Sequence, residues 1–347
     1  MPDCAVSIIV PCRNEAGSIE AFLRSLLDQQ IDCAWEALIA DGASDDGTRQ
    51  ILDRYARMHS RIRVIHNGGR YTAMGLNQAI RLAQGEICVR MDVHTEYAPD
   101  YVQRSIECLK RTGCENVGGP ARTRAASPLQ RTVAAAFHSF FSTGGALFHD
   151  VDYEGYVDTV PYGCWWRSKL LEIGLFDESL VRNEDDELNL RLTLAGGRIY
   201  QCPAILSWYY PRSTINGLVR QYFQYGFWKV FVFHKHRRLP SWRHVIPALF
   251  LLVNVALLTA LALTAVGFGL PDALTPLLAI DGIYLACSFG ASLLVASSAG
   301  GMSLLYAPFV FLAFHLGYGL GFLVGCVYVL QASGRAASHE AFTSLTR

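Results

Sequence analysis

Three long apolar stretches near the carboxyl end constrain the fold of this chain most. Between residues 245 and 334 the only charged side chains are Asp272 and Asp281, although the 347-residue chain carries 30 basic and 30 acidic residues. A helix needs about 20 apolar residues to cross the hydrocarbon of a bilayer. The stretches that reach this length are residues 245–270, 274–297 and 304–330. We therefore expect about three transmembrane helices within 245–334, followed by a tail at 335–347.

Polar and small residues inside these stretches bear on how the helices pack. Ionisable groups are costly inside a membrane, so Asp281 and His315 fit either a polar pair within or between helices or a contact with a lipid-borne substrate. The run GYGLGFLVG at 317–325 has small residues four positions apart, which is typical of closely packed helices.

A basic and aromatic segment precedes the first apolar stretch. No acidic residue lies between Glu187 and Asp272, whereas nine basic residues do: Arg191, Arg198, Arg212, Arg220, Lys229, Lys235, Arg237, Arg238 and Arg243. The run HKHRRLPSWRH at 234–244 predicts a cytoplasmic side by the positive-inside rule. No signal peptide is evident at the N-terminus, so we also expect the first part of the chain to stay in the cytoplasm. We expect segment 213–244 to lie at the membrane interface.

The first 212 residues have the pattern of an α/β domain. Apolar runs that read as strands alternate with stretches of helical periodicity. The strands are expected at 6–11, 36–41, 62–67 and 85–92, and the helices at 18–30, 48–59 and 73–84. This alternation predicts a mostly parallel, Rossmann-like sheet covered on both faces. Ligands of such sheets bind beyond the carboxyl ends of the strands.

Polar residues gather at three of those strand ends. They are Arg13, Asn14 and Glu15 behind Pro11 at the end of the first strand, Asp41, Asp45 and Asp46 at the end of the second, and Asp92 and His94 at the end of the fourth. The run GASDDGT also suits a simple turn and helix cap. A turn does not explain acids at three neighbouring ends, whose repulsion calls for a cation or hydrogen-bond donors. No GxGxxG follows the first strand and no P-loop motif occurs, which disfavours a dinucleotide or P-loop site.

Three ordered motifs resemble a known family. VSIIVPCRNE, ALIADGASDDGT and GEICVRMDVH look like the signature of family 2 glycosyltransferases with the GT-A fold, and residues 162–200 are similar to that family's acceptor half. The resemblance covers roughly residues 5–230. Within the family, the DxH motif and the three-span tail look most like the ExoA-type enzymes of succinoglycan biosynthesis.

The resemblance implies a nucleotide-sugar site at the first two strand ends. Pro11, Arg13 and Glu15 would line the base and ribose pocket, and Asp41 would hydrogen-bond the base or ribose. Many members have two adjacent aspartates where this chain has Asp41 and then glycine. Asp46 matches a later acid of the motif, although an acid at a helix N-terminus explains it equally well.

The resemblance also implies a divalent cation at Asp92 and His94, where it would neutralise the donor diphosphate. Mg²⁺ prefers oxygen ligands, and an imidazole suits Mn²⁺ better, so either ion is a candidate cofactor. A histidine at a strand end can also be merely structural.

The run NEDDE is similar to the family's catalytic base motif. An inverting transfer needs a carboxylate beside the acceptor hydroxyl to take its proton. The family match selects Asp185, next to Glu184, over its competitors Asp186 and Glu187. A charged first turn of a helix would look the same in sequence.

Acceptor contacts are expected from two places. Trp165 and Trp166 suit stacking on a sugar, with core packing as the alternative. Arg220, Gln221 and Tyr225 lie in an aromatic and basic helix that suits either a lipid-linked acceptor or simple interfacial anchoring. Gln221 resembles the first residue of the QxxRW motif of processive relatives, but the RW pair is missing here. A single transfer is therefore favoured over polymer synthesis.

The resulting hypothesis is a membrane glycosyltransferase of the bacterial inner membrane, with its catalytic domain in the cytoplasm. It would move one sugar, glucose from UDP-glucose, onto a polyprenyl-diphosphate-linked saccharide. Other polysaccharide-assembly enzymes are expected partners, and nucleic acid is not. The alternatives are a polyprenyl-phosphate sugar synthase and a non-catalytic membrane scaffold or transport protein.

Overall fold

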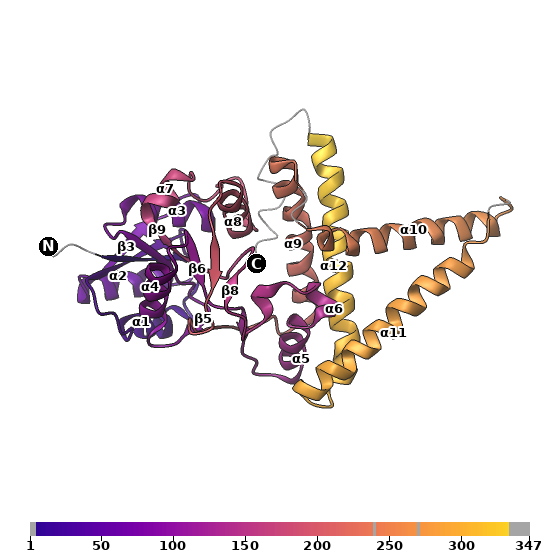
Figure 1. The fold of residues 1–347 in the computed structure, drawn as a ribbon, viewed down its shortest axis with the longest axis horizontal. Helices are drawn as coiled ribbons and strands as arrows, with labels where there is room; N and C mark the ends of the chain where they lie inside the picture. Colours follow the sequence, from indigo (N-terminus) through magenta and orange to yellow (C-terminus); the bar gives the residue numbers. More distant parts are fainter. Residues whose placement is uncertain (1–4, 239–240, 269–270, 333–347) are drawn as a thin grey trace. The chain divides into compact units, whose positions relative to one another are not determined.

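The computed structural model describes residues 5–238, 241–268 and 271–332. The chain divides into two units (Figure 1). The first comprises Met1–Thr123 and Leu147–Tyr210, and the second comprises Arg124–Ala146 and Pro211–Arg347. Residues 124–146, which we expected within the catalytic domain, thus group with the apolar helices. The expected tail at 335–347 lies outside the described residues.

A mixed sheet forms the centre of the first unit. Among the described residues it has eight strands in the order β3-β2-β1-β4-β9-β6-β10-β8. In that order they are β3 (Ile62–His66), β2 (Trp35–Asp41), β1 (Val6–Cys12), β4 (Ile87–Arg90), β9 (Cys164–Trp166), β6 (Asn116–Gly118), β10 (Ile199–Gln201) and β8 (Gly155–Tyr156). Strands β3, β2, β1 and β4 are parallel, as are β6 and β10, whereas β9 and β8 run against their neighbours. The predicted, mostly parallel sheet is confirmed.

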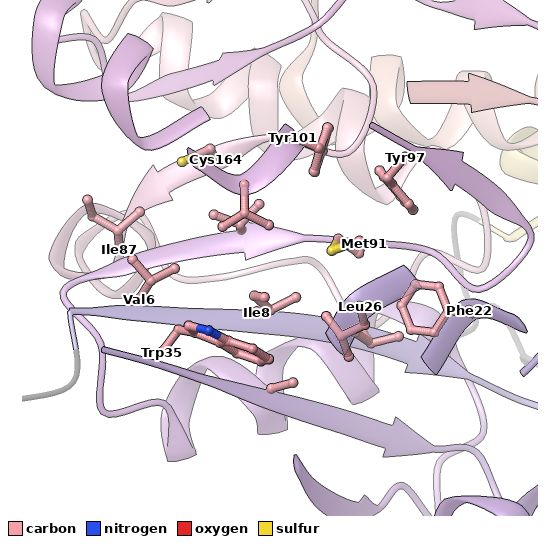
Figure 2. Packing of buried hydrophobic residues seen from close by; sticks show 14 of the residues in the cluster. Val6, Ile8, Phe22, Leu26, Trp35, Ile87, Met91, Tyr97, Tyr101 and Cys164 are labelled. Carbon is pink, nitrogen blue, oxygen red and sulfur yellow. The ribbon is translucent and has the colours of Figure 1, made fainter. Parts of the chain in front are cut away.

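Helices cover both faces of this sheet because its strands are apolar on both sides. On one face pack α1 (Ile19–Leu27), α2 (Thr48–Met58) and α4 (Tyr101–Thr112). On the other face pack α3 (Thr72–Leu82), α7 (Arg167–Glu172) and α8 (Glu184–Leu194). Strand β1 contributes side chains to both cores, since Ile8 belongs to the first cluster and Ile9 to the second. Figure 2 shows the first cluster, with Tyr97 and Tyr101 beside Met91.

A small second sheet lies downstream of the β4 end. It pairs β5 (Thr95–Tyr97), β11 (Ser207–Tyr209) and β7 (Arg122–Thr123) in the order β5-β11-β7. The short helix η1 (Leu147–His149) follows the return of the chain to the first unit. Strand β5 begins three residues after Asp92, so it fixes the segment that carries the DxH motif.

The second unit is helical in the part of the chain that the structure describes. Its helices are α5 (Pro128–Phe137), α6 (Phe140–Thr143), α9 (Ile215–His236), η2 (Trp242–His244), α10 (Ile246–Ala265), α11 (Leu274–Ala299) and α12 (Ser303–Ala332). Among the described residues, three helical stretches are long and apolar enough to cross a membrane, namely Trp242–Ala265, Leu274–Ala299 and Ser303–Gln331. The three predicted spans are confirmed by length and composition. Residues 269 and 270 of the first predicted stretch lie outside the described residues.

The predicted close packing of small residues is found between α9 and α12, which lie alongside one another (Figure 1). A Cβ added at Gly321 of α12 would come within 2.0 Å of the backbone oxygen of Phe223 on α9. Only glycine permits that approach. His315 of α12 is held by the Tyr284 hydroxyl at 3.1 Å and the Phe141 carbonyl at 2.9 Å. His315 therefore forms polar contacts between helices, which is the first of the two alternatives given for it.

Candidate active site

Two loops at the carboxyl edge of the sheet are joined by hydrogen bonds. One loop follows β1 and the other follows β2. In each of these bonds a backbone N–H of one loop donates to a side-chain oxygen of the other loop. The pairs are Asn14 N–H to Ser44 Oγ at 2.8 Å, Asp45 N–H to Asn14 Oδ1 at 2.9 Å, Glu15 N–H to Thr48 Oγ1 at 2.7 Å and Ala16 N–H to Asp46 Oδ2 at 3.0 Å. The polar residues of these strand ends thus form one connected structure, as the parallel sheet predicts.

Asp41 and Asp46 both serve this loop structure. Asp41 is 2% exposed, and its Oδ1 accepts hydrogen bonds from the hydroxyl and the backbone N–H of Ser44. Its Oδ2 lies 3.6 Å from Arg49 Nη1. Asp46 Oδ1 accepts from the hydroxyl and backbone N–H of Thr48, the first residue of α2. Slight burial raises the pKa of Asp46, but these hydrogen bonds outweigh it and the pKa is lowered. The helix-terminus alternative thus accounts for the contacts of Asp46.

The glycine after Asp41 has a steric cause. A Cβ at Gly42 would lie 3.1 Å from Arg13 Cβ and 3.2 Å from the Arg70 carbonyl oxygen. An aspartate in this position would have to displace the loop after β3 or the Arg13 side chain. The same contacts place Arg13 beside the second strand end. Pro11 is half-buried within β1, and Arg13 is half-buried just beyond it.

A buried arginine holds Asp92. Arg90, the last residue of β4, donates from Nε to Asp92 Oδ1 at 2.8 Å and from Nη2 to Oδ2 at 3.0 Å. The Asp92 backbone N–H donates to the Tyr97 hydroxyl at 2.6 Å. Asp92 therefore has a fixed side chain and a fixed backbone.

His94 is much more accessible than Asp92. Its side chain is 57% exposed, and its Nδ1 lies 3.9 Å from Glu15 Oε1. This contact brings the end of β1 and the segment after β4 together, as the sequence predicts. Glu15 and His94 thus face one another across the edge of the sheet.

Asp92 and His94 suit a cation that also binds a substrate. Within the described residues no three His, Cys, Asp or Glu side chains are grouped closely enough to form a metal cage. Mg²⁺ sites on phosphate substrates commonly use one or two carboxylates and complete their coordination with phosphate oxygens and water. Arg90 occupies one lone pair on each Asp92 oxygen and leaves the others. Asp92 and the exposed imidazole of His94 therefore fit a cation bound together with a diphosphate.

The base motif opens α8, and its four acids have different surroundings. Glu187 is fully buried and paired with Arg191, with Oε2 2.7 Å from Nη2, so it cannot serve as a base. Glu184 is 7% exposed and lies 3.5 Å from Arg90 Nη1. Asp185 and Asp186 are half-buried. The structure thus narrows the accessible acids of the motif to these two.

The preceding Asn183 adopts a left-handed conformation with φ of 61° and starts the helix. Burial, and then the charge of Asp185, raise the pKa of Glu184 to about 7, although Arg90 opposes the shift. Burial works to lower the pKa of Arg90, but the charges of Asp92 and Glu184 together outweigh it and raise the pKa. Arg90 therefore stays positive between two carboxylates.

Arg90 is the residue that sequence reasoning missed. We read it as part of a buried strand, yet it bridges Asp92 and Glu184, which lie 92 positions apart in the chain. A charged residue inside an otherwise apolar strand was the available signal, because buried charges require partners. The positions of those partners appear only in the folded sheet.

The two tryptophans point to opposite faces of β9. Trp165 is 1% exposed and packs against Phe176 at 6.0 Å between ring centroids, in the core on the α3 side. It is therefore not available to stack on a sugar, which corrects our expectation for this residue. Trp166 is half-buried, lies against the other core cluster and pairs with Ile87 at the start of β4, at the opposite end of that strand from Asp92. Core packing therefore describes both tryptophans.

The remaining acceptor candidates belong to the second unit. On α9, the Gln221 amide donates to the Tyr225 hydroxyl at 3.0 Å, one helical turn away. Arg220 is exposed beside them. These three residues form one polar face on a helix that packs on α12 through its other side.

Comparison with known proteins identifies the family. The profile of the family described as "Glycosyl transferase family 2" matches residues 7–171. The succinoglycan biosynthesis protein ExoA of Rhizobium meliloti (strain 1021) is 34% identical over 243 residues, which cover 69% of this chain and 73% of that protein. The chain belongs to glycosyl transferase family 2.

Other relatives of this family 2 glycosyltransferase extend the comparison. The dolichyl N-acetyl-alpha-D-glucosaminyl phosphate 3-beta-D-2,3-diacetamido-2,3-dideoxy-beta-D-glucuronosyltransferase of Methanococcus voltae is 27% identical over 259 residues, covering 72% of this chain and 80% of that protein. The structure of the mannosyltransferase PcManGT from Pyrobaculum calidifontis, in complex with GDP-Man and Mn²⁺, matches with a TM-score of 0.61 at 22% identity and covers 88% of each chain. This likeness concerns the fold, and it confirms the predicted GT-A domain.

The predicted class of enzyme is likewise confirmed, so the non-catalytic scaffold or transport alternative is set aside. In this family 2 glycosyltransferase, the acids after β1 and β4 and the first turn of α8 belong to the same unit. That unit combines a cation-compatible carboxylate with half-buried acids suited to proton transfer.

Proposed function

We propose that this enzyme transfers one sugar, glucose from UDP-glucose, with inversion onto a polyprenyl-diphosphate-linked saccharide. The observation that carries the proposal is the Arg90 bridge, which joins Asp92 on the donor side to Glu184 beside the base on the acceptor side. A transfer between two substrates needs such a meeting of leaving-group and base sites, because proximity removes much of the entropic barrier.

The chemistry follows from these residues. Asp185 takes the proton of the acceptor hydroxyl as that oxygen attacks the anomeric carbon. Asp92 and His94 would hold the divalent cation, Mn²⁺ or Mg²⁺. When bound, the cation supplies positive charge that offsets the charge on the departing diphosphate. Arg13, Glu15 and the loop built on Asp41 and Asp46 bind the nucleotide, and Pro11 shapes the end of β1.

The relatives support a lipid-linked acceptor and polysaccharide assembly. ExoA is named for succinoglycan biosynthesis, and the Methanococcus voltae enzyme is named for a dolichyl phosphate sugar. PcManGT was solved with GDP-Man and Mn²⁺, which supports a nucleotide donor and a divalent cation but names a different donor. GDP-mannose is therefore one of the donors to be tested.

Membrane attachment fits this acceptor. A polyprenyl carrier stays in the bilayer, and the three apolar helices would keep the catalytic unit beside it. We infer that the protein lies in the bacterial inner membrane with the catalytic unit in the cytoplasm, where nucleotide sugars are made. The polar face of Arg220, Gln221 and Tyr225 would meet the acceptor, and other polysaccharide-assembly enzymes would supply it.

The test is donor turnover by the full chain in nanodiscs with a lipid extract. UDP-glucose, UDP-galactose, UDP-N-acetylglucosamine and GDP-mannose are each incubated with Mn²⁺ or Mg²⁺, and release of nucleoside diphosphate is measured. We expect cation-dependent release that is greatest with UDP-glucose. No release from any donor with either ion would contradict the proposal.

The polyprenyl-phosphate sugar synthase makes a different prediction at Gln221. A bare lipid phosphate needs no contact with an acceptor sugar, so Gln221→Ala would leave the apparent KM for the acceptor unchanged. Our proposal expects that KM to rise by about 5–10-fold, because a lost hydrogen bond to the sugar costs about 1 kcal/mol. Trp165→Ala and Trp166→Ala cannot discriminate between the two, since both rings pack in the core of the first unit.

A further inference from the structure

Arg90 sits where a charge is costly. Its side chain is 7% exposed, and it ends a strand whose other residues are fully apolar and buried. A buried guanidinium requires acidic partners, and the structure supplies two. Nε and Nη2 of Arg90 both bond the Asp92 carboxylate, and Nη1 is directed at Glu184. Tyr101 adds a hydrogen bond from its hydroxyl to the Arg90 carbonyl at 3.3 Å.

Structural support alone is a poor explanation for this network. Buried ion pairs are weak sources of stability, because desolvation offsets their attraction, and apolar replacements are often as stable. Both acids paired with Arg90 also occupy positions in the proposed chemistry. Asp92 is a proposed cation ligand, and Glu184 precedes the proposed base Asp185.

The geometry has a consequence for cation binding. Both Asp92 oxygens already accept hydrogen bonds from the guanidinium. A divalent cation at the same carboxylate would share it with a positive charge only a few ångströms away, and the two cations repel one another. A donor diphosphate would bring the negative charge needed to offset that repulsion.

We propose that Arg90 is a positioning residue that keeps the Asp92 carboxylate neutralised until the cation arrives together with the donor diphosphate. Glu184 anchors the guanidinium from the other side and so keeps it beside Asp92. This inference rests on the proposed function for the identity of the donor. The expected behaviour of the protein with Mn²⁺ alone does not depend on it.

The experiment compares Mn²⁺ binding and turnover for the full chain in nanodiscs. Binding of Mn²⁺ alone is followed by electron paramagnetic resonance, first without nucleotide and then with UDP. For Arg90→Met we expect Mn²⁺ affinity without nucleotide to rise by about tenfold or more, because a repelling unit charge is removed. We expect its kcat with donor and acceptor to fall by about 10–100-fold, as is usual when support for a metal ligand is lost.

Two further variants separate charge from geometry. Arg90→Lys keeps the charge but loses the fork, so Mn²⁺ affinity without nucleotide should stay near the wild-type value while kcat still falls. Glu184→Gln leaves the guanidinium with less opposing charge and should weaken Mn²⁺ binding in the wild-type background, with a smaller effect in the Arg90→Met background. The matched control is Arg63→Met, which removes a guanidinium 2.9 Å from the buried Glu36 elsewhere in the sheet and should leave Mn²⁺ affinity unchanged.

The outcomes are distinct. A folded Arg90→Met protein that binds Mn²⁺ no more tightly than wild type overturns the inference, as does an Arg90→Lys protein that gains affinity like Arg90→Met. Circular dichroism and size-exclusion profiles establish folding, and Arg90→Lys keeps the test available if Arg90→Met does not fold. A rise in Mn²⁺ affinity for Arg90→Met, with no turnover of any donor by the wild-type protein, would support the role of Arg90 and overturn the proposed function.

Discussion

The two units of this protein treat polar and apolar side chains in opposite ways. In the first unit the apolar residues are buried on both faces of the sheet, and the charged residues meet at its carboxyl edge. In the second unit large apolar residues such as Leu252 and Leu294 are exposed, while the polar His315 is held between helices. On a soluble surface such apolar exposure would favour aggregation, whereas lipid accommodates it.

This contrast predicts whether a substitution in each unit affects turnover or stability. In our proposal the charges at the carboxyl edge of the first unit serve the chemistry, so their loss should change turnover more than stability. The small residues of the second unit permit close helix contact, so their loss should change stability more than chemistry.

The largest effect is expected at the base. Asp185→Asn should lower kcat by about 10²–10⁴-fold, the usual contribution of a general base, and leave the thermal unfolding midpoint nearly unchanged. Asp186→Asn is the matched control, because Asp186 is equally half-buried and should remain close to wild type. Nucleoside diphosphate release measures both. Equal losses in the two variants would remove the distinction between these acids.

The helix contact of the second unit should respond through stability. Gly321→Ala places a methyl group against the Phe223 carbonyl and should cost about 1–3 kcal/mol, as overpacking usually does. Gly290→Ala on α11 is the control, since among the described residues no atom beyond the neighbouring backbone of its own helix lies within 4 Å of its added Cβ. Thermal unfolding in nanodiscs separates them. Nucleotide affinity of the folded fraction should be the same for both, and a selective loss in Gly321→Ala would mean that the contact serves the site.

A smaller change is expected at His94. His94→Asp replaces an imidazole with a hard oxygen ligand, so the ratio of activity with Mn²⁺ to activity with Mg²⁺ should fall by about tenfold, which corresponds to ~1.4 kcal/mol. Turnover at saturating concentrations of each ion gives the ratio. An unchanged ratio would show that His94 is not a ligand.

The smallest effect concerns pH. The folded pKa of Glu184, about 7, lies above its ordinary value of 4.5. The folded state therefore binds this proton more tightly, and the associated stability is present below pH 4.5 and is lost as pH rises through 7. Glu184→Gln carries no titrating group here and cannot lose this stability. Its thermal unfolding midpoint, relative to that of the wild type, should therefore rise between pH 5 and 8. Parallel profiles would mean that Arg90 holds Glu184 ionised in that range.

Much of the fold could be predicted from the sequence because its signals are local. The strand and helix periodicity of residues 6–90 and the three apolar stretches depend only on neighbouring residues. The grouping of residues 124–146 with the membrane helices has no comparable signal. That segment is amphipathic rather than apolar, and its partners on α11 and α12 lie far along the chain.

The candidate site was predictable to the level of its strand ends and no further. Parallel topology was sufficient to bring Glu15 and His94 together. The burial of Trp165 depends on the register of β9, which alternates the two tryptophans between opposite cores. The bridge from Arg90 to Glu184 depends on where α8 begins against the sheet. These features arise from long-range packing, which a single sequence does not display.

The most direct test of the central claim follows a radiolabelled sugar from its donor to its product. The full chain in nanodiscs is given labelled UDP-glucose, Mn²⁺ and a bacterial lipid extract, and the organic phase is analysed for labelled saccharide. We expect a lipid-linked product from the wild-type protein, and none from Asp92→Ala, because the cation that would neutralise the diphosphate then loses its carboxylate ligand. Label that stays in the aqueous phase for wild type, or a product that forms equally well with Asp92→Ala, would contradict the account.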